Sequence, residues 1–113
     1  GETAAIQYLK ANGYTIRHIN WRREHLELDI VAQTAEELVI VEVKTRSRDH
    51  WELPEDAVNS AKIKRIVSAA DFYIELFDLD LPVRFDIISV TGTSPGFEIE
   101  HIEDAFYSPV NTY

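Results

Sequence analysis

The chain has 113 residues, a length typical of one domain with a single hydrophobic core, so we treat 1–113 as one domain. No apolar run approaches the roughly 20 residues that cross a bilayer, and the absence of Cys excludes disulfides and thiolate zinc sites. The formal net charge of −9 argues against a protein that coats nucleic acid nonspecifically. The start, GETAAIQYLK, lacks the basic and apolar segments of a signal peptide, and we expect no membrane association. The absence of Cys fits a cytoplasmic location, which we also expect.

The charge is unevenly distributed along the chain. Residues 1–65 contain ten of the eleven Lys and Arg residues and eleven acidic residues, a net charge of −1. Residues 66–113 contain one Arg and nine acidic residues, a net charge of −8. We therefore expect any nucleic-acid-binding face in the first 65 residues. An acidic second half that only keeps the protein soluble would explain the same imbalance.

Hydrophobic periodicity and turn residues predict the elements in chain order. Ala5, Ile6 and Leu9 have helical spacing. Gly13 is a typical helix terminator, and Pro54 suits the first turn of a second helix. The predicted elements are a helix over 2–12, strands over 14–21, 26–32 and 37–45, a helix over about 55–77, and strands over 83–91 and 97–102. This order indicates an α/β fold, a mixed central sheet of about five strands flanked by α-helices.

Charged residues on two of these strands are unusually placed. Side chains alternate faces along a strand, so Glu42 and Lys44 share one face of the strand over 37–45, and three Val residues take the other. A strand with such a Val face is typical of a covered, central position, where Glu and Lys are costly unless paired or bound. The same alternation on the strand over 26–32 predicts one face with Glu27, Asp29 and Val31 and the other with Leu26, Leu28, Ile30 and Ala32.

A hairpin across QTAEE would bring the two strands together. A turn centred between Ala35 and Glu36 places Asp29 opposite Glu42, and Glu27 opposite Lys44. Two facing carboxylates repel each other unless they share a cation, and hard oxygen ligands suit Mg²⁺ or Mn²⁺. Lys44 beside them would orient or deprotonate a water, or stabilise charge on a phosphate. A surface ion pair between Glu and Lys explains the same spacing without any site.

The segments LELDIVA and LVIVEVKTR resemble the core motif of the PD-(D/E)xK nuclease superfamily, in which an Asp ends one strand and an acid-x-Lys motif follows on the next. A closer resemblance, to the YraN-like family of bacterial proteins, extends over almost the whole chain. Its further segments are GETAA at 1–5, NWR at 20–22, PEDAV at 54–58, RFDIISV at 84–90 and HIEDAF at 101–106. This resemblance implies a restriction-endonuclease-like fold and a metal-dependent endonuclease that acts on DNA, including branched or structured DNA.

The resemblance also implies roles for individual residues. Asp29 and Glu42 would be ligands of Mg²⁺ or Mn²⁺, and Lys44 the catalytic lysine. Glu2 matches an acid that reaches the metal site in related resolvases, although an acid near a helix N-terminus is favourable in itself. The residues expected near substrate are Thr45, Arg46, Arg22 and Lys62. For Lys62, a solvated helix face is the simpler explanation.

Basic and aromatic residues suggest a further nucleic-acid contact. The candidates for a phosphate-binding groove are Arg17, Arg22, Arg23, Arg46 and Arg48, with Trp21 and Trp51 available to stack on unpaired bases. Core or edge Trp residues beside solvated Arg residues would give the same pattern. Three functions therefore stay open: a DNA nuclease, working as a homodimer or with a partner protein, a non-catalytic nucleic-acid-binding module, and a protein-interaction domain that uses the acidic half.

Overall fold

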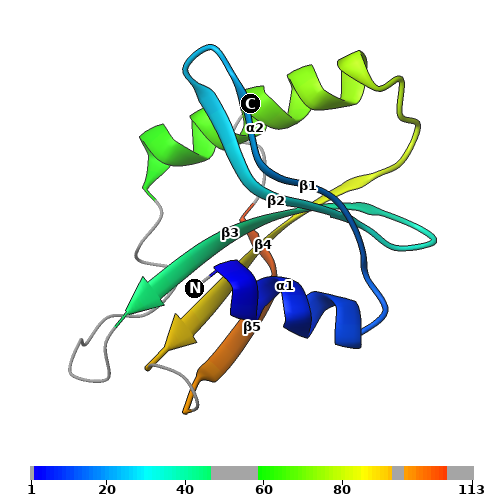
Figure 1. The fold of residues 1–113 in the computed structure, drawn as a ribbon. Coiled ribbons are helices and arrows are strands. Elements are labelled where there is room, and N and C mark those ends of the chain that lie inside the picture. The colour runs from blue at the N-terminus through cyan, green and yellow to red at the C-terminus, as the bar shows by residue number, and fades with distance from the viewer. Residues whose placement is uncertain (1, 47–58, 93–95, 107–113) are drawn as a thin grey trace.

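The computed structural model describes residues 2–46, 59–92 and 96–106, and it contains a five-stranded sheet with one helix packed on each face (Figure 1). The sheet order is β1-β2-β3-β4-β5, with β3 and β4 parallel and the other neighbours antiparallel. The elements are α1 (Glu2–Ala11), β1 (Thr15–Arg23), β2 (Leu26–Gln33), β3 (Leu38–Arg46), α2 (Ser60–Leu76), β4 (Val83–Thr91) and β5 (Glu98–Phe106). The predicted mixed sheet with flanking helices is confirmed. The predicted start of the second helix, with Pro54, lies outside the described residues.

Helix α1 covers one face of the sheet. Its residues Ala5 and Leu9 are fully buried against a cluster that includes Val39 and Val41 of β3. The helix stops at Gly13, which has a φ of 89°, a left-handed conformation that Gly adopts without a steric penalty. The predicted helix and its terminator are therefore confirmed, and the Val face of β3 is covered as expected.

Helix α2 covers the opposite face. Asn59 caps its N-terminus, where the side-chain oxygen accepts a hydrogen bond from the backbone N–H of Lys62 at 2.9 Å. Tyr73, which is fully buried, lies at the centre of this packing, and its ring contacts Trp21 edge-on. Within the described part of the chain, no helix is both long and apolar enough to cross a membrane.

The hydroxyl of Tyr73 connects α2 to β1. It accepts a hydrogen bond from Arg17 Nε at 3.0 Å and lies 2.6 Å from His18 Nδ1. Tyr73→Phe keeps the ring but leaves both partners partly buried without that oxygen. We expect it to lower the free energy of unfolding by about 1–2 kcal/mol. Urea denaturation measures the loss, and an unchanged midpoint would show that water replaces the hydroxyl at no cost.

The hairpin of β2 and β3 has the predicted turn but not the predicted length of pairing. Thr34 closes the turn, and the backbone pairs run from Gln33–Leu38 to Ile30–Val41, in the register that the sequence predicts. Beyond that pair, β2 continues to pair with β1, and the end of the β1–β2 hairpin lies beside α2 (Figure 1). The two strands therefore separate just before Asp29 and Glu42.

This separation overturns the strict alternation predicted for β2. Leu28 packs with Val31 on the α2 side of the sheet, whereas Ile30 and Ala32 pack on the α1 side. Leu28 and Ile30 are two apart and were expected to share a face. On the neighbouring strand, Asn20 has a φ of 51°, which is not a β conformation, at the level of Asp29. The local bend brings the end of the hairpin over α2.

A buried polar network lies on β4, away from this opening. Asp86 is 0% exposed and accepts hydrogen bonds from Arg84 Nε at 2.9 Å and Arg84 Nη2 at 2.8 Å. His101 Nε2 lies 2.7 Å from the same carboxylate, and the backbone N–H of Asp104 donates to it at 3.0 Å. Arg84 Nη2 also donates to the hydroxyl of Tyr14 at 2.6 Å. These contacts join β4 to β5 and to the segment that follows α1.

Candidate active site

Asp29 occupies the point where β2 and β3 separate. Its Oδ2 accepts a hydrogen bond from the backbone N–H of Val43 at 3.0 Å. That N–H belongs to the part of β3 that no longer pairs with β2. The carboxylate thus takes the place of a strand partner, because a backbone donor needs an acceptor when it is removed from water. This contact fixes Asp29 beside the outer half of β3.

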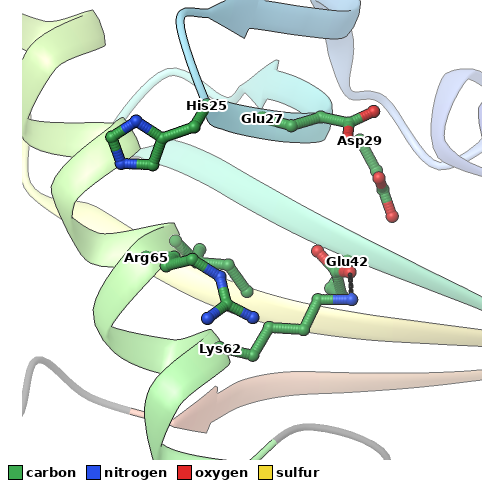
Figure 2. Close-up of a pocket in the computed structure, with 7 residues that line it drawn as sticks. His25, Glu27, Asp29, Glu42, Lys62 and Arg65 are labelled. Atoms are coloured by element: carbon green, nitrogen blue, oxygen red, sulfur yellow. Dashed lines mark ion pairs between the residues drawn. The ribbon is translucent and has the colours of Figure 1, made fainter.

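Glu42 faces the same opening from β3, and two lysines approach it. Its side chain is only 7% exposed, and its Oε1 lies 2.8 Å from Lys62 Nζ and 4.0 Å from Lys44 Nζ. Figure 2 shows the carboxylates of Asp29 and Glu42 pointing toward a common space, with Lys62 reaching in from α2. Two acids and two ammonium groups from three elements therefore surround one position.

A pocket of about 240 Å³ opens at this position. Its volume accommodates a metal ion together with several waters or a phosphate oxygen. The residues that line it are His25, Glu27, Asp29, Glu42, Lys62, Arg65 and Ile66. The hairpin of β1 and β2, strand β3 and helix α2 thus form its walls.

The charges in the pocket perturb one another. Burial raises the pKa of Glu42, and the nearby charge of Asp29 raises it further, against the opposing effect of Lys62 and Lys44. Burial lowers the pKa of Lys44, and the ammonium of Lys62 adds to that effect. Burial also disfavours the charged form of Lys62, but its hydrogen bond to Glu42 and the negative charges of Glu42 and Asp29 together outweigh this and raise the pKa. Repelling carboxylates held in a partly buried pocket favour a bound cation.

The donor set fits a hard divalent ion. Within residues 2–46, 59–92 and 96–106, no three His, Asp or Glu side chains are grouped closely enough to hold a metal on their own. A site with Asp29 and Glu42 alone agrees with the preference of Mg²⁺ for one or two carboxylates, completed by water and substrate phosphate.

The other residues expected near the site are spread more widely. Glu2 begins α1, which packs on the other face of the sheet, and it does not line the pocket. Its proposed role at the metal stays a prediction. Thr45 is exposed and Arg46 is half-buried at the end of β3. Arg22, which is largely exposed, pairs with Glu27 at 3.3 Å. The pairing of β2 with β3 ends at Ile30–Val41, so the predicted apposition of Glu27 and Lys44 does not form.

The pocket also contains two residues that the sequence analysis did not select. Arg65 follows Lys62 by one helical turn, and both line the pocket from α2. His25 lies in the turn between β1 and β2, which the bend of the hairpin carries toward α2. The spacing of Lys62 and Arg65 is the signal in the sequence that would have found the helix face. Nothing in the local sequence distinguishes His25.

The proposed groove of Arg and Trp residues is only partly assembled. Trp21 packs against Tyr73 in the core, as the simpler explanation has it. Arg17 donates to Tyr73 and to Gln33, and Arg23 lies over the ring of Phe72. Arg48 and Trp51 lie outside the described residues. These arginines therefore serve the contact between β1 and α2 in this structure.

Comparison with known proteins places the chain in a family. Residues 1–90 match the uncharacterised protein family UPF0102. A UPF0102 protein of Bacteroides thetaiotaomicron is 59% identical over 97% of this chain and 91% of its own length. Relatives from Parabacteroides distasonis and Porphyromonas gingivalis are 55% and 46% identical, over 96% and 94% of this chain and 90% and 80% of their own lengths. The chain therefore belongs to the uncharacterised protein family UPF0102.

Proposed function

We propose that this protein is a metal-dependent nuclease that hydrolyses phosphodiester bonds in DNA. The observation that carries the proposal is the convergence of Asp29, Glu42 and Lys62 on one pocket where β2 and β3 separate, with Lys44 Nζ 4.0 Å from Glu42 Oε1. The resemblance of LELDIVA and LVIVEVKTR to the PD-(D/E)xK motif supports it, and membership of that superfamily is part of the proposal.

The residues that line the pocket, and Lys44 beside them, divide into distinct roles. Asp29 and Glu42 would hold Mg²⁺ or Mn²⁺, which would supply Lewis acidity toward the phosphate and make a water more acidic. Lys44 has a lowered pKa, so its amine is well suited to orient the attacking water and to accept a proton from it. Lys62 and Arg65 line the helix side of the pocket and would bind the phosphate backbone.

The surface charge bears on how DNA is bound. A formal net charge of −9 opposes tight binding of DNA by one isolated copy. We therefore propose that a second copy or a partner protein supplies additional basic surface. We also propose that the enzyme works in the cytoplasm. Thr45, Arg46 and Arg22 remain candidates for contacts with DNA outside the pocket.

A cleavage assay with Mg²⁺ or Mn²⁺ on linear, flapped and four-way DNA tests the proposal. The matched variant is Asp29→Asn, because an amide oxygen still accepts from the Val43 N–H while the charge is lost. We expect wild-type protein to cleave at least one substrate, and Asp29→Asn to lower the rate by at least about a hundredfold.

Other outcomes would contradict the nuclease proposal. DNA binding by both proteins with no cleavage by wild type would favour a nucleic-acid-binding module. Absence of DNA binding at low salt, together with a stable protein partner, would favour an interaction domain that uses the acidic half.

A further inference from the structure

The ammonium of Lys62 occupies the position beside Glu42 that a bound metal ion would take. The cap at Asn59 fixes its backbone at the start of α2, and its ammonium crosses the pocket to Glu42 (Figure 2). At 2.8 Å from Oε1, the ammonium makes a charge-assisted hydrogen bond, whereas Lys44 Nζ, at 4.0 Å, is too distant for one. The side chain of Glu42 is therefore already neutralised by a cation from within the chain.

A divalent ion bound at Glu42 Oε1 would compete with this ammonium for the same oxygen. Mg²⁺ binds carboxylate oxygens at about 2.0–2.1 Å, so an ion on Glu42 Oε1 would lie within a few ångströms of Lys62 Nζ. Two positive centres at that separation in a partly buried pocket repel strongly. An ion on that oxygen therefore requires the ion pair to open before or as it binds.

Lys62 is better placed to leave than Lys44. Its side chain is 35% exposed, and its ammonium is carried on a flexible four-carbon stem that reaches in from α2. The side chain of Lys44, in contrast, is 22% exposed and is on the same strand as Glu42. Once released, the Lys62 ammonium remains on the helix face that it shares with Arg65, at the wall of the pocket. A phosphate of the DNA backbone fits between two such donors.

We propose that Lys62 is a displaceable counter-ion, which occupies Glu42 in the metal-free protein and is released by the metal to bind a phosphate of the nucleic acid. This inference rests on the proposed metal-dependent nuclease function. It makes Lys62 a substrate-binding residue whose availability depends on the metal. Binding of metal and of DNA would then be positively coupled through one side chain.

The first test compares Mn²⁺ binding, by calorimetry without DNA, between Lys62→Met and Lys64→Met. Met keeps most of the aliphatic stem, and Lys64 is exposed on the same helix, so the two variants change the net charge equally. We expect Lys62→Met to bind Mn²⁺ about three- to tenfold more tightly than wild type, because it removes the competitor, and Lys64→Met to change the Kd less than twofold. Equal affinities for the two variants would overturn the inference.

The second test uses wild-type protein and so does not depend on the folding of a variant. An amine-acylating reagent, followed by mass spectrometry, reports how accessible each lysine is. We expect Mg²⁺ to increase the labelling of Lys62 while that of Lys64 stays constant. Unchanged or reduced labelling of Lys62 at saturating Mg²⁺ would overturn the release step.

The outcomes separate this inference from the function on which it depends. If wild type binds no Mn²⁺, both the proposed function and the inference fail. If wild type binds Mn²⁺ and Asp29→Asn does not, but Lys62→Met binds as wild type does, only the displacement by Lys62 fails. If Lys62→Met binds Mn²⁺ more tightly yet loses affinity for DNA in the presence of Mn²⁺, both roles of Lys62 are supported.

Discussion

Lys44→Met is expected to lower the rate of DNA cleavage by about 10²–10³-fold while leaving Mn²⁺ binding intact. The reason is the geometry at Glu42. Lys44 Nζ is 4.0 Å from Oε1, so it contributes little to holding the carboxylate, and the proposed function assigns its amine to the attacking water. Single-turnover cleavage with saturating metal measures the rate, and calorimetry measures the Kd for Mn²⁺.

An exposed lysine of α2, Lys64, provides the control for this prediction. Lys64→Met removes the same charge from an exposed position, so it is expected to cleave at nearly the wild-type rate. Asp29→Asn, in contrast, is expected to lose metal binding as well as cleavage. A Lys44→Met protein that cleaves DNA as fast as wild type would remove Lys44 from the chemistry and leave Lys62 as the functional lysine of the pocket.

Asp86→Asn is expected to destabilise the fold by about 3–5 kcal/mol at neutral pH. The carboxylate is fully buried and accepts from Arg84 through both oxygens. An amide offers one acceptor oxygen, and its NH₂ group would face donors. The guanidinium of Arg84 would therefore lose one of its two acceptor oxygens. For a domain of this size, the loss corresponds to a fall in Tm on the order of 15 °C or more. Thermal unfolding followed by circular dichroism measures it.

The effect of Asp86→Asn depends on pH in a defined direction. Burial alone would raise the pKa of Asp86, but the hydrogen bonds from His101, Arg84 and the Asp104 backbone outweigh it and lower the pKa below its ordinary value of 3.8. A carboxyl group whose pKa is lower in the folded protein than in the unfolded chain contributes its full stability above the unfolded pKa. That contribution is lost as the pH falls through the folded pKa. The difference in Tm between wild type and Asp86→Asn should therefore narrow as the pH falls below about 4.

Glu103→Gln is the matched control for Asp86→Asn, because it makes the same chemical change beside the same arginine. Its carboxylate lies 3.7 Å from Arg84 Nη1, and its side chain is 61% exposed. Solvent screens such a pair, so we expect little change in stability. If the two variants had equal effects, the buried network would owe its stability to something other than the carboxylate of Asp86.

The sequence alone determined the elements and their order, and it selected Asp29, Glu42 and Lys62 of the pocket but not His25 or Arg65. Alternation along β3 predicted that Glu42 and Lys44 share a face, and the turn at Thr34 gave the register of the hairpin. These features depend on neighbours within about ten residues, so local patterns contain them. Asp29 and Glu42 lie just past the last pair of that hairpin, so the predicted direct pairing of the two does not form, although both line the same pocket.

Only the tertiary structure decided how the pocket is built. The separation of β2 from β3 follows from the packing of Trp21 and Leu28 against α2, a contact between segments some fifty residues apart. The same packing brings Lys62 to Glu42, although no periodicity in either element indicates that pair. Local patterns fix which face a side chain takes within its own element, whereas the position of one element relative to another depends on the free energy of packing the whole core.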